Sequence, residues 1–138
     1  MQQYLLWAVL AMAAYALVPV LSKIAEAELP MLIVALIANV IVVVINVAVV
    51  VYLGDLGRVS MSPASIGVAV IAGILLGVAV VSYFHALSIG PVSVVVPIFG
   101  LFLVFSAVAG FLILDESLTA RNVIGLALAM AAIYLTAV

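Results

Sequence analysis

The side chains that could do chemistry in this sequence are a few hydroxyls, amides and one imidazole within long apolar segments. His85 is the only side chain well inside such a segment that titrates near neutral pH, so it could pass a proton. Asn39 lies further from the polar loops, where an amide needs a protein partner or water. We therefore expect the following residues to line a cavity that binds a solute: Tyr15, Asn39, Ser82, Tyr83, His85 and Ser93.

Each of these groups also has a structural interpretation. An asparagine between apolar helices often serves as a hydrogen-bonding link, which contributes only about 0.6–2 kcal/mol in a membrane. Asn39 fits either role, whereas Asn46, one heptad further along, fits the link better. His85 lies about one helical turn from a loop, where its imidazole could simply meet interfacial water.

Charged residues are confined to the short polar segments, which excludes several classes of function. No Asp or Glu occurs within an apolar segment, so there is no pair of carboxylates, no nucleophile with its base and no ligand set for a metal. The sequence also contains no glycine-rich phosphate loop. Three Lys and Arg residues are too few for a nucleic-acid surface. We expect neither an enzyme nor a metal or other cofactor, and no nucleic-acid partner.

Composition identifies the elements that must position these groups. Hydrophobic residues make up 72% of the 138 residues and charged residues 6%, whereas soluble domains contain about half and a quarter. The mean hydropathy is +1.69, and a helix needs about 20 apolar residues to cross a bilayer. We predict an all-α, multi-pass protein of the cell membrane, here a prokaryotic plasma membrane. It has one domain over residues 1–138, with five spans at about 4–22, 31–53, 64–86, 91–114 and 122–138.

Two prolines lie inside the first and fourth predicted spans. Pro19 should free the carbonyl of Tyr15, and Pro97 that of Ser93, because proline cannot donate the helical hydrogen bond. Counted from the nearest loop at about 1.5 Å per residue, both lie roughly 6–9 Å inside the same face of the membrane. Prolines are often merely tolerated in membrane helices. The matched depth nevertheless favours a hinge or gate formed by Pro19 and Pro97.

Small residues recur at the spacing that lets helices approach closely. Gly73 and Gly77 in the third span have the GxxxG spacing. Gly125 and Ala129 give the fifth span a similar small face. We expect these four residues to serve helix packing, within the chain or between two copies.

The C-terminal part of the sequence, about residues 83–135, resembles the EamA-type domain of the drug/metabolite transporter superfamily. The N-terminal part fits more loosely. Common members of that family carry ten spans as two inverted five-span repeats around a central substrate cavity. The resemblance rests on the pair Ala86-Leu87, on a small-residue turn into a proline-bearing helix (Gly90, Pro97), on Glu116-Ser117-Leu118-Thr119 and on Ile124-Gly125.

A single repeat of this kind resembles a half-transporter. The resemblance then implies two oppositely inserted copies in the lipid bilayer, which form an antiparallel homodimer and reproduce the inverted repeat. Arg58 and Arg121 should lie on the side of the N-terminus and Lys23 on the other, so the positive-inside rule gives only a weak bias. This weak bias is compatible with dual topology. Where many family members carry a basic residue early in the second span, this chain has Asn39.

The expected function is transport of a small neutral, zwitterionic or amphipathic solute by alternating access. An anionic solute would need a buried positive partner, and the antiparallel arrangement would place the two copies of Lys23 on opposite faces. The lack of a carboxylate within a span disfavours proton-coupled export of cations. Two alternatives stay open, a flippase subunit for a lipid or lipid-linked sugar and a non-transporting membrane scaffold subunit.

Overall fold

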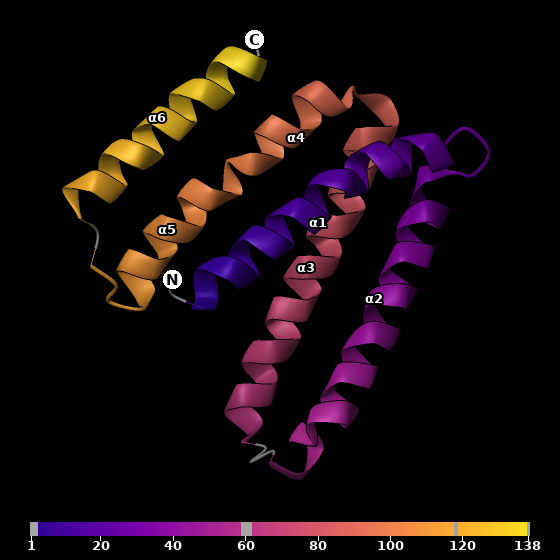
Figure 1. Ribbon diagram of the computed structural model, residues 1–138, viewed down its shortest axis with the longest axis vertical. Helices are drawn as coiled ribbons and strands as arrows, with labels where there is room; N and C mark the ends of the chain where they lie inside the picture. Colours follow the sequence, from indigo (N-terminus) through magenta and orange to yellow (C-terminus); the bar gives the residue numbers. More distant parts are fainter. Residues whose placement is uncertain (1–2, 59–61, 118, 138) are drawn as a thin grey trace. The chain divides into compact units, whose positions relative to one another are not determined.

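The computed structural model describes residues 3–58, 62–117 and 119–137, and within these residues it contains helices and turns but no strand (Figure 1). The chain forms two compact units, residues 1–88 and residues 89–138. The elements are α1 (Gln3–Ala25), α2 (Met31–Leu53), the 3₁₀ helix η1 (Asp55–Arg58), α3 (Pro63–Ile89), α4 (Val92–Gly100), α5 (Phe102–Ile113) and α6 (Ala120–Ala137).

Within the described residues, four stretches of helix are long and apolar enough to cross a membrane. They are α1, α2, α3 and the run of α4 with α5, while α6 is a shorter apolar helix. At about 1.5 Å per residue, the 18 residues of α6 extend roughly 27 Å, close to the thickness of the hydrocarbon core. The prediction of an all-α, multi-pass membrane protein is confirmed.

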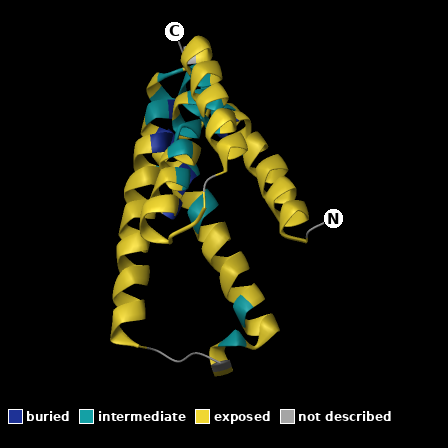
Figure 2. Cartoon of the chain, turned by 90° about the vertical axis from the view of Figure 1, so that its left-hand side faces the viewer, coloured by how far each residue is buried: buried dark blue, intermediate teal, exposed yellow. Residues whose placement is uncertain are grey.

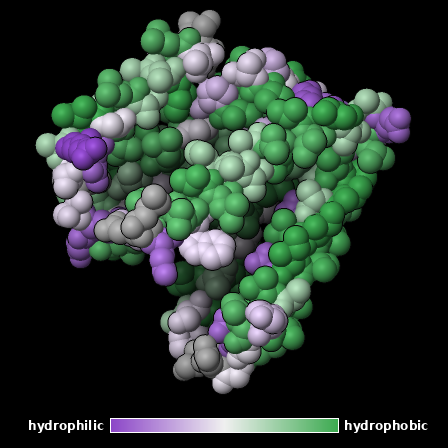
Figure 3. All heavy atoms as spheres, viewed as in Figure 1, coloured by the Kyte–Doolittle hydropathy of each residue, from purple (hydrophilic) through white to green (hydrophobic). Residues whose placement is uncertain are grey.

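Apolar side chains cover the outside of the helices in both units. Trp7 in α1 is 72% exposed and Phe105 in α5 is 74% exposed, and exposed residues dominate the helices in Figure 2. Hydrophobic residues likewise form most of the visible surface in Figure 3. Helices that are apolar all round suit contact with lipid, because they leave no polar face for water.

The buried residues of the first unit gather where α1 ends, α2 begins and α3 ends. The rings of Tyr83 and Phe84 meet edge to face in this cluster, with their centroids 5.8 Å apart. The buried side chains are Pro19, Ser22, Met31, Ala35, Tyr83, Phe84 and Leu87. This end of the unit therefore holds its packed core.

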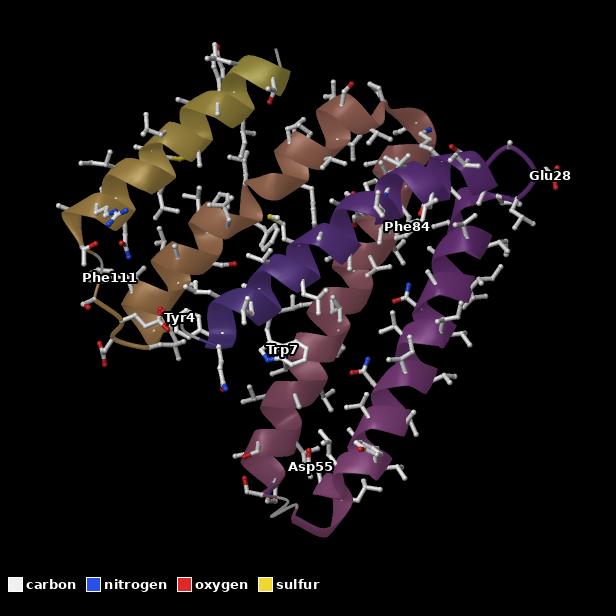
Figure 4. All side chains as sticks on the ribbon, in the orientation of Figure 1. Tyr4, Trp7, Glu28, Asp55, Phe84 and Phe111 are labelled. Atoms are coloured by element: carbon white, nitrogen blue, oxygen red, sulfur yellow. The ribbon has the colours of Figure 1, made fainter. Side chains whose placement is uncertain are left out.

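A short turn joins α1 to α2, and the two helices pack against each other. The N–H of Leu29 donates to the carbonyl of Ala25 at 3.1 Å. Lys23 Nζ pairs with Glu26 Oε2 at 2.8 Å, and Glu28 projects from the turn (Figure 4). The charges of this loop thus lie at the end of the helices, where they can reach water.

Turn residues fix both ends of the connection between α2 and α3. Gly54 ends α2 with a φ of 70°, a left-handed conformation that glycine adopts without steric cost. Ser62 caps α3, because its Oγ accepts a hydrogen bond from the N–H of Ser65 at 3.1 Å. Pro63 then occupies the first helical position, where no N–H is needed.

In the second unit, α4 packs against α6. A Cβ added at Gly100 would lie 3.8 Å from Cδ1 of Ile133, so this glycine sits directly under an α6 side chain. Thr119 precedes α6 as its N-cap. Its Oγ1 accepts a hydrogen bond from the N–H of Asn122 at 3.2 Å and donates to Asn122 Oδ1 at 2.7 Å.

Candidate functional site

A groove of about 430 Å³ lies between α2 and α3 in the first unit. Asn39 is the one polar side chain among the described residues that line it. Apolar side chains of both helices form the walls, including Leu36, Leu76 and Val80. The groove is therefore an apolar space with a single hydrogen-bonding side chain.

Asn39 is half-buried and satisfies part of its amide through its own helix. Its Nδ2 donates to the carbonyl of Ala35 at 2.7 Å. Asn46 makes the same bond to the carbonyl of Val42 at 2.8 Å, but its side chain is exposed and does not line the groove. Two residues of one type on one helix thus differ only in their surroundings.

Gly73 and Gly77 are two of the residues that α3 contributes to the groove that Asn39 lines from α2. A Cβ added at either glycine would meet no atom within 4 Å. Among the described residues, no side chain therefore packs onto them, and the closely packed helix pair that their spacing predicts is not formed here within the first unit. The same open space surrounds Gly125 in α6, and Ala129 is half-buried there. A role of these residues in packing against a second copy stays a prediction.

The other predicted cavity residues lie outside this groove. Tyr15, Ser82 and His85 are exposed, and Tyr83 is buried at the end of α3. The carbonyl of His85 accepts a hydrogen bond from Ser88 Oγ at 2.7 Å. Ser93 is exposed in α4, in the second unit. Of the six, the structure brings Asn39 alone into the groove.

A second groove of about 370 Å³ lies between α1 and α2. Ser22 is its one polar side chain among the described residues, and Val18, Leu21, Ile37 and Ile41 are among its apolar ones. Sequence periodicity does not predict this groove, because apart from its two asparagines α2 is apolar and no polar face distinguishes the side toward α1.

The two candidate hinge prolines differ in their effect on the helices. Pro19 is buried within α1, which continues through it to Ala25. Pro97 lies within α4, and the helix ends three residues later at Gly100. There the N–H of Leu101 donates to the carbonyl of Ile98 at 3.1 Å, before α5 begins. The interruption of the fourth span therefore lies at Gly100–Leu101, and the glycine three residues after the proline is its sequence signal.

Glu116, from the motif that carries the resemblance, folds back over the end of α5. Its N–H donates to the carbonyl of Gly110 at 3.3 Å. A Cβ added at Gly110 would lie 2.9 Å from Glu116 Oε2. Asp115 makes this reversal with a φ of 53°, and Leu118 of the same motif lies outside the described residues. The motif thus closes the end of a membrane helix.

Ionisable side chains are not gathered into a reactive cluster in the described part of the chain. No group of three or more His, Asp or Glu residues lies close enough there to hold a metal ion. Neither α2 nor α3 contains an Asp, Glu, Lys or Arg residue. The groove can therefore bind through shape, apolar contact and one amide.

Known proteins similar to this chain are transporters by description. The EamA-like transporter family matches residues 2–138. A Sinorhizobium protein described as an uncharacterized transporter in the cobO 3' region is 30% identical over 138 residues, which covers 99% of this chain and 98% of that protein. No solved structure gives a significant match. A match over nearly the whole chain shows that this protein belongs to the EamA-like transporter family.

Proposed function

We propose that the protein moves a small neutral, zwitterionic or amphipathic solute across the membrane as an antiparallel homodimer, by alternating access. The α2–α3 groove carries this proposal, because it offers an uncharged binding space within the apolar part of two membrane helices. A closed route through the bilayer needs more helices than one such repeat supplies. Two copies in opposite orientations would provide them and would expose equivalent surfaces to both sides.

The family match and the relative support this assembly. The family matches residues 2–138, and 98% of the relative's length aligns with this chain, so that relative also has about the length of one such repeat. The few charged residues also favour it, because three Lys and Arg residues divided over two sides give little preference for one orientation. Pro97 and the interruption at Gly100–Leu101 supply a place where the fourth span can bend between states.

Orientation can be measured directly, because the chain contains no cysteine. Ala27→Cys places a thiol in the α1–α2 turn, and Gly57→Cys places one in η1, where a Cβ meets no atom within 4 Å. We expect a membrane-impermeant maleimide added to intact cells to label each variant in about half of the molecules. Labelling after permeabilisation is the control for reactivity. Complete labelling at one position and none at the other would contradict the antiparallel homodimer.

The groove between α1 and α2 favours a second candidate, a flippase subunit for a lipid or lipid-linked sugar. Its lining is apolar except for Ser22, which suits an acyl chain better than a polar solute. Proteoliposomes with a fluorescent lipid in both leaflets would test this candidate. Faster loss of inner-leaflet fluorescence to external dithionite, relative to protein-free liposomes, would support the flippase. No acceleration would contradict the flippase.

A further inference from the structure

We infer that the α2–α3 groove binds the transported solute itself, and that this solute is an uncharged molecule with an apolar body and a hydrogen-bond donor. This inference rests on the proposed transport function and names its substrate class. The groove volume of about 430 Å³ lies near the lower end of the range for small-molecule sites, roughly 300–1,000 Å³. It is therefore large enough for a small solute.

The hydrogen-bond donor follows from the orientation of the Asn39 amide. The carbonyl of Ala35 can only accept a hydrogen bond, so the group 2.7 Å from it must be the amide nitrogen. The amide oxygen then lies on the other side of the planar group. The hydrogen bonds of the described residues include none to this oxygen. An oxygen accepts, so it would recognise a hydroxyl or an N–H of the solute.

The absence of charge follows from what surrounds Asn39. The described residues that line the groove carry no charged side chain. An ion placed there would lose its hydration without gaining a partner, which is strongly unfavourable. An apolar body, by contrast, would replace lipid or water against Leu36, Leu76 and Val80.

The space for this body depends on Gly73 and Gly77. Because a Cβ at either position would meet nothing within 4 Å, no other helix of the described chain fills the volume next to these two glycines of the groove. A larger side chain at Gly77 would project into this volume without disturbing a packed neighbour. Gly67 is a matched control on the same helix, since it has the same open surroundings and does not line the groove.

The test uses the full chain in liposomes and a tryptophan reporter. Trp7→Phe removes the single native tryptophan. Ile74→Trp places a new one at an exposed position beside Gly73 that does not itself line the groove. Three nitroxide quenchers serve as probes. Hydroxy-TEMPO is uncharged and has one hydroxyl donor, methoxy-TEMPO lacks the donor, and carboxy-TEMPO is an anion.

We expect hydroxy-TEMPO to add a saturable quenching component to the linear one that probe dissolved in lipid produces. Loss of one hydrogen bond should raise the half-saturating concentration of methoxy-TEMPO about five- to tenfold. Carboxy-TEMPO should quench only linearly. This comparison of three probes on one protein does not depend on whether any further variant folds.

Two pairs of substitutions then assign the effect to named residues. Asn39→Leu should bring hydroxy-TEMPO to the level of methoxy-TEMPO, whereas Asn46→Leu should change nothing, although both remove the same bond within α2. Gly77→Leu should abolish saturation with both uncharged probes, and Gly67→Leu should leave it intact.

Several outcomes would overturn the inference. They are purely linear quenching by every probe, equal saturation by carboxy-TEMPO, and equal effects of Asn39→Leu and Asn46→Leu. Saturation in detergent that disappears in liposomes would also overturn it, because lipid would then occupy the groove. The cysteine labelling of Ala27→Cys and Gly57→Cys reports orientation independently of binding. If quenching is saturable but labelling shows a single orientation, the labelling contradicts the homodimer. The saturable quenching then still supports this inference.

Discussion

The contact between Gly110 and Glu116 predicts how these two positions depend on each other. Gly110 is buried in α5, and an added Cβ would lie 2.9 Å from Oε2 and 3.4 Å from Cδ of Glu116. In Gly110→Ala the carboxylate must therefore move, but it is the far end of an exposed, flexible side chain, so the cost should be small, at most about 0.5 kcal/mol, the lower end of that for an off-rotamer side chain. Alanine otherwise stabilises a helix by about 0.5–1 kcal/mol relative to glycine. In the native sequence the gain in helix stability should therefore be only partly offset.

Removing the carboxylate should separate the two effects. In a Glu116→Ala background, Gly110→Ala keeps the gain in helix stability and its Cβ meets no carboxylate. It should therefore stabilise the protein by about 0.5–1 kcal/mol. The coupling free energy between the two positions should then be small, about 0.5 kcal/mol, at the lower end of the range for residues in contact. The measurement is a double-mutant cycle, with the free energy of unfolding taken from circular dichroism in mixed micelles of rising SDS content.

Gly67→Ala is the control for the gain in helix stability that alanine brings, because its Cβ would meet no atom within 4 Å. Its effect should be the same with and without Glu116. If Gly110→Ala changed the free energy of unfolding equally in both backgrounds, the carboxylate would not lie over Gly110. The explanation of the acidic motif as the closure of α5 would then be wrong.

Three further predictions concern caps and the fourth span. Thr119→Val removes the acceptor of the Asn122 N–H and should lower the free energy of unfolding by about 0.5–2 kcal/mol in the same titration; no loss would contradict the N-cap. Gly54→Ala forces a side chain into a φ of 70° and should cost about 1–2 kcal/mol, while a gain in stability like that expected for Gly67→Ala would refute the strain. Pro97→Ala should keep or raise stability but slow solute transport in proteoliposomes, with Pro91→Ala, outside the helix, as control. An unchanged transport rate would exclude the hinge.

The fold class could be predicted from the sequence because lipid leaves few options for the backbone. Apolar runs of sufficient length must be helical in a bilayer, and the turns carry recognisable residues. Ser62 with Pro63 begins α3, Gly54 ends α2, and Thr119 begins α6. These signals act over a few residues, so they can be read without knowledge of the neighbouring helices.

The site was less accessible to prediction, because it depends on which helix faces which. The depth of a residue within its span follows from counting residues from the nearest loop, and this count places Asn39 far from the loops. Which side of α2 faces α3 does not follow, since both helices are apolar all round and offer no polar face as a guide. The GxxxG spacing of Gly73 and Gly77 indicates close packing, yet the space next to them is open in this chain. The break after Gly100 does not follow from the proline alone, because α4 continues past Pro97 for three residues before it ends.

Asn39 and Asn46 show what turns a structural amide into a candidate binding group. Both donate to the carbonyl four residues back, which lowers the cost of placing an amide in lipid without help from another helix. Residue type, spacing and local hydrogen bonding are thus the same at both positions. What differs is the opposite wall, where α3 presents glycines to Asn39 and leaves a groove of about 430 Å³ between them. On the proposed function, the glycines and the asparagine form one feature, in which Gly73 and Gly77 supply the volume and Asn39 supplies the selectivity.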